Sequence, residues 1–75
     1  MEETVTSRLR AKGDVIRRER LALVLRQDEL AEKASLGLST LRTAERSERV
    51  AASTIRKLAD ALDVPPRAIS TIVDE

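Results

Sequence analysis

Apolar side chains recur every three or four positions along the chain, a spacing that predicts helices and shows no strand-like alternation. The pattern is clearest in DVIRRERLAL, residues 14–23, where Ile16, Arg20 and Leu23 share one face. Asp14 stands where its carboxylate can cap the first turn. We therefore expect a first helix over these residues, with this face turned toward the core.

Val5 and Leu9 continue the same face toward the N-terminus, which is compatible with an earlier helical turn or two that ends or joins at Gly13. A length of 75 residues allows one small domain. We interpret residues 1–13 as an N-terminal extension with some helix, and residues 14–73 as the folded domain.

A second helix fits QDELAEKA, residues 27–34, and carries Asp28 and Glu29 in its first turn, where the helix dipole favours anions. Its narrow inward face consists of Leu30, Ala31 and Ala34. Small residues on this face would allow another helix to approach closely.

A third helix fits LSTLRTAER, residues 38–46, with Gly37 as its N-cap. At about 100° per residue the helix has two distinct faces. The face expected to pack on the first two helices holds Leu41, Ala44 and Glu45, flanked by Leu38. The face expected to meet solvent or a ligand holds Ser39, Arg42, Thr43 and Arg46.

A fourth helix is expected from Ser53, a good N-cap, through TIRKLADAL. Its apolar stripe is Ile55, Leu58, Ala59 and Leu62. The prolines of VPP, residues 64–66, end this helix, and Pro66 suits the first turn of a last short helix over RAISTIV. The predicted fold class is therefore all-α, a compact bundle of five short helices.

Composition excludes several kinds of site, because the chain has no cysteine, no histidine and no aromatic residue. Zinc fingers, disulfides and Cys–His or Ser–His catalysis need the first two residue types. Modules that bind single strands or RNA stack bases on aromatic rings. We identify no catalytic residues, no metal ligands and no cofactor site, and we expect no enzymatic activity.

Membrane insertion and export are not indicated by the sequence. No apolar run approaches about 18 residues, and the start MEETVTSR lacks the apolar stretch of a signal peptide. We expect a soluble, cytoplasmic protein without a membrane partner.

The basic residues are unevenly distributed, although 14 Lys and Arg against 13 Asp and Glu give a net charge of only +1. Seven of the cations lie between Arg8 and Arg26, and eleven of the fourteen are arginine, which suits phosphate and guanine. An ordinary solvated surface remains the alternative reading of this distribution.

The stretch QDELAEKASLGLSTLRTAER, residues 27–46, resembles the helix-turn-helix of the phage Cro/repressor (xenobiotic-response-element type) family. Gln27 followed by ELA opens its second helix, S-T-L and E-R match its third, and LADALDV resembles its fourth. The resemblance covers roughly residues 14–69 without a gap. It implies a lambda-repressor-like DNA-binding domain.

The resemblance also implies a structural ion pair between Arg20 and Glu45. A basic residue near the end of the first helix commonly pairs with this glutamate in the family, and both residues lie on inward faces here. A buried carboxylate needs such a partner. The alternative is that both side chains lie on a solvated face.

The resemblance points to three base-contact positions in the third helix, Leu38, Ser39 and Thr43. Leu38 can cover a thymine methyl group, and Ser39 can form hydrogen bonds. Thr43 can form either a hydrogen bond or a methyl contact, and Arg42 can bind guanine O6 and N7. Leu38 packing on the second helix is the alternative for that residue.

Phosphate contacts are expected from Arg26, Gln27, Arg46 and Arg49. Gln27 opens the second helix, where free N–H groups and the dipole attract anions, and Arg26 precedes it. Arg46 and Arg49 follow the third helix, where this family meets the DNA backbone, and Arg17 or Arg18 can flank this surface.

Three positions depart from the family's usual glycines, namely Val24, Ser35 and Ser47. A β-branched residue avoids positive φ, so we expect either a different turn at Val24 or a longer first helix.

The preferred interpretation is a DNA-binding transcriptional regulator that reads the major groove of double-stranded DNA. We expect a repressor, acting as a homodimer on a palindromic operator with half-sites about 34 Å apart. The last helix is the candidate dimer surface, with core packing as its alternative, and its residues are Pro66, Ala68, Ile69, Ile72 and Val73. The alternative function is a protein-interaction module, antitoxin-like or adaptor-like, on the same fold.

Overall fold

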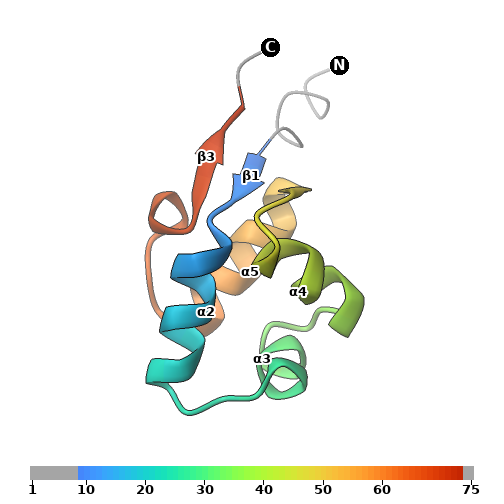
Figure 1. Ribbon diagram of the computed structural model, residues 1–75, viewed down its shortest axis with the longest axis vertical. Helices are drawn as coiled ribbons and strands as arrows, with labels where there is room; N and C mark the ends of the chain where they lie inside the picture. Colours follow the sequence, from blue (N-terminus) through green and yellow to red (C-terminus); the bar gives the residue numbers. More distant parts are fainter. Residues whose placement is uncertain (1–8, 74–75) are drawn as a thin grey trace.

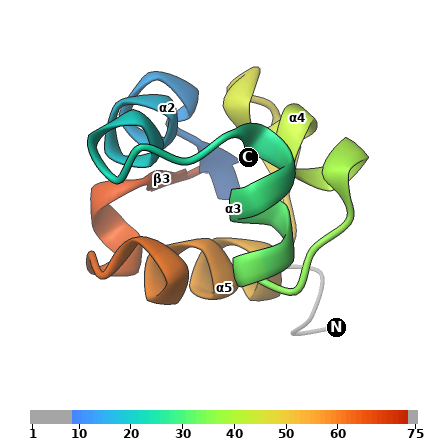
Figure 2. The ribbon, with the colours of Figure 1, turned by 90° about the horizontal axis from the view of Figure 1, so that it is seen from below.

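The computed structural model describes residues 9–73 of the chain. Four α-helices joined by short turns form its body, and they surround one apolar core (Figures 1 and 2). In chain order they are α2 (Gly13–Ala22), α3 (Gln27–Lys33), α4 (Leu38–Glu45) and α5 (Ala52–Leu62). Each of the first four predicted helices is confirmed.

The core is aliphatic and receives side chains from every helix. The largest fully buried residues are Ile16, Leu30, Leu41, Ile55, Leu58 and Ile69. Small residues fill the remaining space where helices meet, since Ala31 and Ala34 of α3 and Ala44 of α4 are buried. The inward faces predicted for the second, third and fourth helices are therefore confirmed.

The predicted all-α class is wrong in one respect, because the described residues also form a small antiparallel sheet. Its strands are β1 (Leu9–Ala11), β2 (Arg49–Val50) and β3 (Ser70–Ile72), in the order β2-β1-β3. Leu9 lies between Val50 on one side and Ile72 on the other. Figure 1 shows β1 and β3 at the end of the molecule opposite α3.

The last predicted helix is replaced by a 3₁₀ turn, η1 (Pro66–Ala68), followed by β3. Pro66 does occupy the first position of that turn, as expected. The β-branched residues Thr71 and Ile72 then favour an extended strand, and β1 offers them an antiparallel partner. Within this segment Ile69 is completely buried, so it belongs to the core and not to a free dimer surface.

The start of the domain also differs from the prediction. Residues Leu9–Ala11 form a strand where a helical turn was expected, while Val5 lies outside the described residues. The N-cap of α2 is Lys12, which places Asp14 inside the first turn, and Leu23 at the other end is 45% exposed. Similarly, α5 begins one residue ahead of Ser53, with Ala51 as its N-cap.

All four helices end in the same way, with a residue in the left-handed region just beyond the last turn. These residues are Val24, Ser35, Ser47 and Asp63, with φ between 57° and 63°. The amide that follows each one bonds a carbonyl five residues back, as in Leu25 N–H to Arg20 O at 3.1 Å. This is the Schellman motif. The prediction of a different turn at Val24, or of a longer first helix, is therefore wrong. Val24 adopts the positive φ that glycine usually has at this position.

Candidate nucleic-acid interface

Helix α4 has one face in the core and the opposite face at the surface. Leu41, Ala44 and Glu45 are at most 4% exposed, whereas Ser39 and Arg42 are exposed. The helix lies against both α2 and α3, which fix its axis (Figure 2). An exposed helix face on a fixed support is the geometry needed to enter a major groove.

The buried carboxylate of Glu45 ties the three helices together. Arg20 Nε donates to Glu45 Oε2 at 2.6 Å, and a second Arg20 nitrogen donates to Oε1 at 3.1 Å. Gln27, the first residue of α3, donates its side-chain Nε2 to the same Oε1 at 3.0 Å. Arg20 also donates to the Leu25 carbonyl at 3.0 Å, so one cluster links α2, the turn after it, α3 and α4.

The Arg20–Glu45 pair predicted from the sequence is thus formed, and it is buried on both sides, with 10% and 4% of the two side chains exposed. No buried side-chain nitrogen or oxygen lacks a partner in the described part of the chain. A buried ion pair is favourable only with such complete hydrogen bonding. Its structural effect is to fix the end of α4 against α2 and α3.

An open hollow of about 380 Å³ lies between the start of α3 and the start of α4. It brings together four of the predicted contact residues and one acidic neighbour, and its lining is Arg26, Gln27, Asp28, Leu38 and Arg42. Leu38 is only half-buried, which leaves part of its side chain on this surface. Two predicted phosphate contacts and two predicted base contacts therefore share one surface.

Arg26 is held by its acidic neighbours at the start of α3. Its Nε bonds Asp28 Oδ1 at 3.1 Å, and the Arg26 guanidinium thereby lowers the pKa of the Asp28 carboxyl. The same bond raises the pKa of Arg26. Both side chains are largely exposed, so this pair is weak and a phosphate can compete for the guanidinium. Gln27 differs, because its side-chain amide already bonds Glu45.

The other two predicted phosphate contacts follow α4. Arg46 is exposed and donates to Glu48 Oε2 at 3.0 Å, a pair that is again solvated. Arg49 is exposed in β2, directly opposite Arg10 of β1. Arg46 and Arg49, together with Arg10, which was not among the predicted contacts, therefore all lie near the C-terminal end of α4.

Thr43 and Ser39 lie one turn apart on α4. The Thr43 hydroxyl donates to the Ser39 carbonyl at 3.0 Å, and Arg46 donates to the same hydroxyl oxygen at 3.4 Å. A threonine has one hydroxyl proton, so this one is used within the helix. The hydrogen-bonding role expected of Thr43 is thereby reduced.

Two further arginines lie at the end of α4. Arg17 is half exposed and donates to the Glu45 backbone carbonyl at 3.4 Å, while Arg10 donates to the Ser47 carbonyl at 3.1 Å. Cations at a helix C-terminus are favourable. The sequence offers Arg17 or Arg18 as a flanking phosphate contact but does not point to Arg10. Arg17 precedes Arg20 by three residues and so lies near the same helix face.

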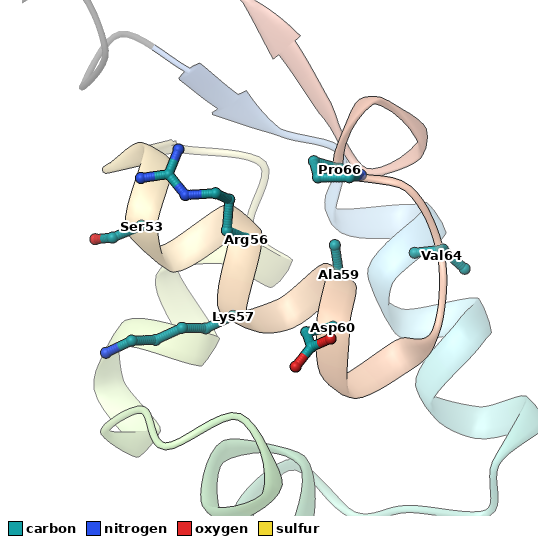
Figure 3. A pocket seen from close by; sticks show the side chains of 7 residues that line it. All are labelled: Ser53, Arg56, Lys57, Ala59, Asp60, Val64 and Pro66. Atoms are coloured by element: carbon teal, nitrogen blue, oxygen red, sulfur yellow. The ribbon is translucent and has the colours of Figure 1, made fainter.

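A second hollow, of about 500 Å³, lies on the outer face of α5 and contains none of the predicted DNA-contact residues, although it includes Pro66 of the predicted dimer surface (Figure 3). Its lining is Ser53, Arg56, Lys57, Ala59, Asp60, Val64 and Pro66. Among residues 9–73, no group of three or more acidic side chains could hold a metal ion. No helix of this part of the chain is long and apolar enough to cross a membrane.

Comparisons with known proteins agree with this geometry. Residues 16–69 match the family model described as helix-turn-helix. The fold is also similar to the crystal structure of the restriction-modification controller protein C.AhdI from Aeromonas hydrophila, with a TM-score of 0.67 and 41% sequence identity. That match covers 73% of this chain and 85% of the controller protein. Among curated proteins, none matches the chain.

The matched segment includes all of α3, α4 and α5 and most of α2, and it contains the predicted DNA-contact residues. The network around Glu45 and the exposed face of α4 lie within it. The chain therefore belongs to the Cro/C1-type helix-turn-helix family of DNA-binding transcriptional regulators.

Proposed function

We propose that the protein binds double-stranded DNA sequence-specifically, with α4 in the major groove and the start of α3 on the sugar-phosphate backbone. The observation that carries this proposal is the arrangement of α4. The C-terminal end of α4 is fixed by the hydrogen bonds of the buried Glu45 side chain, and its outer face exposes Ser39 and Arg42 to solvent. A fixed helix with an exposed guanidinium can bind guanine O6 and N7 with defined geometry.

Backbone contacts come from four residues around the ends of α3 and α4, namely Arg26, Gln27, Arg46 and Arg49. Arg26 and Arg46 have weak carboxylate partners that a phosphate can replace. Each phosphate that is neutralised should steepen the log–log salt dependence of binding by about 0.9. Gln27 contributes mainly through its backbone N–H, since its side chain bonds Glu45.

A homodimer on a palindromic operator is the assembly we propose, because one α4 contacts too few base pairs for selective binding. Of the surface expected from the sequence, Pro66 and Ile72 are exposed and Ala68 and Val73 are partly exposed. Ile72 is 75% exposed and lies in β3, an edge strand of the sheet. We propose repression by occupation of a promoter as the regulatory action of this dimer.

The test is fluorescence anisotropy of a labelled random duplex pool of about 30 base pairs, long enough for two half-sites, followed by sequencing of the bound fraction. We expect an enriched palindrome and a steep loss of affinity with salt. Arg42→Ala should remove selectivity at one base pair per half-site and weaken binding about 10- to 100-fold.

The matched control is Arg56→Ala, which removes an exposed arginine from α5, on the far side of the core. This variant should bind the selected duplex like the parent protein. Equal losses in both variants would indicate general electrostatic attraction. Absence of duplex binding at low salt would favour a protein-interaction module instead.

A further inference from the structure

We propose that α4 recognises the 5-methyl group of pyrimidines in the major groove, through Leu38 and Thr43. This inference rests on the proposed function and specifies which chemical groups of DNA the site selects. The ligand chemistry is a C5-methyl group, which thymine carries and which methylated cytosine presents at the same place in the groove. Binding would therefore depend on base methylation as well as on base identity.

Thr43 supports this proposal because its polar group is engaged within the protein. The hydroxyl proton is donated to the Ser39 carbonyl at 3.0 Å, and the oxygen accepts from Arg46 at 3.4 Å. A base acceptor could use this hydroxyl proton only by displacing the bond to the Ser39 carbonyl. The methyl group of Thr43 needs no such exchange, so an apolar contact is the one that this residue can make at least cost.

Leu38 supports it from a second position on the same helix. The next leucine of α4, Leu41, is completely buried, whereas Leu38 is half-buried and lines the hollow between α3 and α4. The other side chains of that hollow are polar or charged, which leaves Leu38 as its apolar member. A methyl group placed against it would remove apolar surface from water on both sides.

Arg42 predicts which base lies next to the pyrimidine that Leu38 contacts. It follows Leu38 by one helical turn and lines the same hollow, so a guanine bound by Arg42 would lie beside the pyrimidine that Leu38 covers. Thr43 is five residues from Leu38, about 7.5 Å along the helix axis, which exceeds the spacing of about 3.4 Å between base pairs. This separation allows the two side chains to contact different base pairs, and we expect the two methyl contacts to be made there.

The experiment uses duplexes that carry the palindrome enriched from the random pool. Each thymidine is replaced in turn by deoxyuridine, which removes only the 5-methyl group. Loss of one buried methyl should weaken binding about fourfold per half-site at two positions and have no effect elsewhere. A parallel series places cytosine or 5-methylcytosine, each paired with guanine, at the same two positions, where the methylated base should bind about fourfold more tightly.

Three variants separate the two residues. Leu38→Ala should abolish the uracil effect at one position only. At the other position, Thr43→Ser keeps the hydroxyl and should abolish the effect, while Thr43→Val keeps the methyl group and should preserve it. If uracil substitution weakens binding but 5-methylcytosine binds no more tightly than cytosine, the methyl group recognised is that of thymine alone.

Selective binding with no loss on uracil substitution at any position would overturn this inference and leave the proposed function intact. Uracil effects that persist unchanged in Leu38→Ala and Thr43→Ser would overturn it as well. Absence of any selective binding would overturn both proposals.

Discussion

At the scale of single residues, the four helix ends are the least usual feature of this chain. Each Schellman motif places a residue other than glycine at positive φ, which costs about 1 kcal/mol or more per position. Ser47 recovers part of this cost, because its hydroxyl oxygen accepts a hydrogen bond from the Gly13 N–H at 2.9 Å. Val24 has an apolar, β-branched side chain that is 86% exposed.

Replacing Val24 by glycine should therefore stabilise the domain, by about 0.5–1 kcal/mol after the entropic cost of glycine in the unfolded chain. The measurement is urea unfolding followed by far-UV circular dichroism. Ser47→Gly is the matched control, because it relieves the same φ but removes the bond to Gly13. We expect this variant to be no more stable than the parent, and a gain equal to that of Val24→Gly would contradict the argument.

Gly13 is required for a different reason, which is the close approach of α2 to the end of α4. A Cβ atom built there would lie 2.1 Å from the Glu45 carbonyl oxygen. Gly13→Ala should cost about 1–3 kcal/mol of unfolding free energy, because the backbone itself would have to move. In Gly37→Ala the added Cβ meets nothing within 4 Å, so the loss should stay below about 1 kcal/mol, from a weaker N-cap. Similar thermal midpoints for the two variants would show that α2 and α4 can separate freely.

At the scale of helices and strands, the position of α4 depends on the cluster around Glu45. Glu45→Ala should leave Arg20 buried without its partner and cost about 3–5 kcal/mol. A domain this small has little more stability than that, so the variant should be largely unfolded at room temperature. The apolar pair Arg20→Met with Glu45→Leu should recover part of the loss, as measured by urea unfolding, because no charge is left buried although the Leu25 carbonyl and the Gln27 amide lose their partners. An unchanged midpoint for Glu45→Ala would contradict this account.

The helices were predictable because each repeats its apolar spacing over two or three turns. The buried face of α4, with Leu41 and Ala44, follows from that period alone. The strands were not predictable in this way, since β1, β2 and β3 have only two or three residues each. The spacing of Ala68, Ile69 and Ile72 suits a helix equally well, and pairing with β1, some sixty residues away, decides between them.

The candidate site could be predicted only in part, because a repeating pattern gives the positions of residues on a helix but not the contacts of their side chains. The contact residues follow from helix positions and from the resemblance, but the partners of their side chains do not. That Gln27 bonds Glu45, or that Thr43 uses its proton within the helix, depends on the angle between helices and on rotamers. A periodic pattern in the sequence contains neither.

At the scale of the whole molecule, assembly can be tested on the exposed apolar residues. Ile72→Lys should disrupt the homodimer and weaken binding to the palindrome, because a charge would be buried between the two copies. Sedimentation equilibrium measures the first effect and anisotropy the second. Leu21→Lys is the matched control, at a side chain 58% exposed on α2. If Leu21→Lys disrupts the dimer and Ile72→Lys does not, the interface lies on α2.

The Glu45 cluster also has a consequence for the thermodynamics of DNA binding. Because α2, α3 and α4 are already joined by buried and partly buried hydrogen bonds, we expect the helices to lose little conformational entropy on docking. The DNA duplex must then bend or twist to fit the protein closely, and the energy of this deformation depends on its sequence. We therefore expect the operator to be selected in part at base pairs that the protein never touches, where the more easily bent sequence binds more tightly.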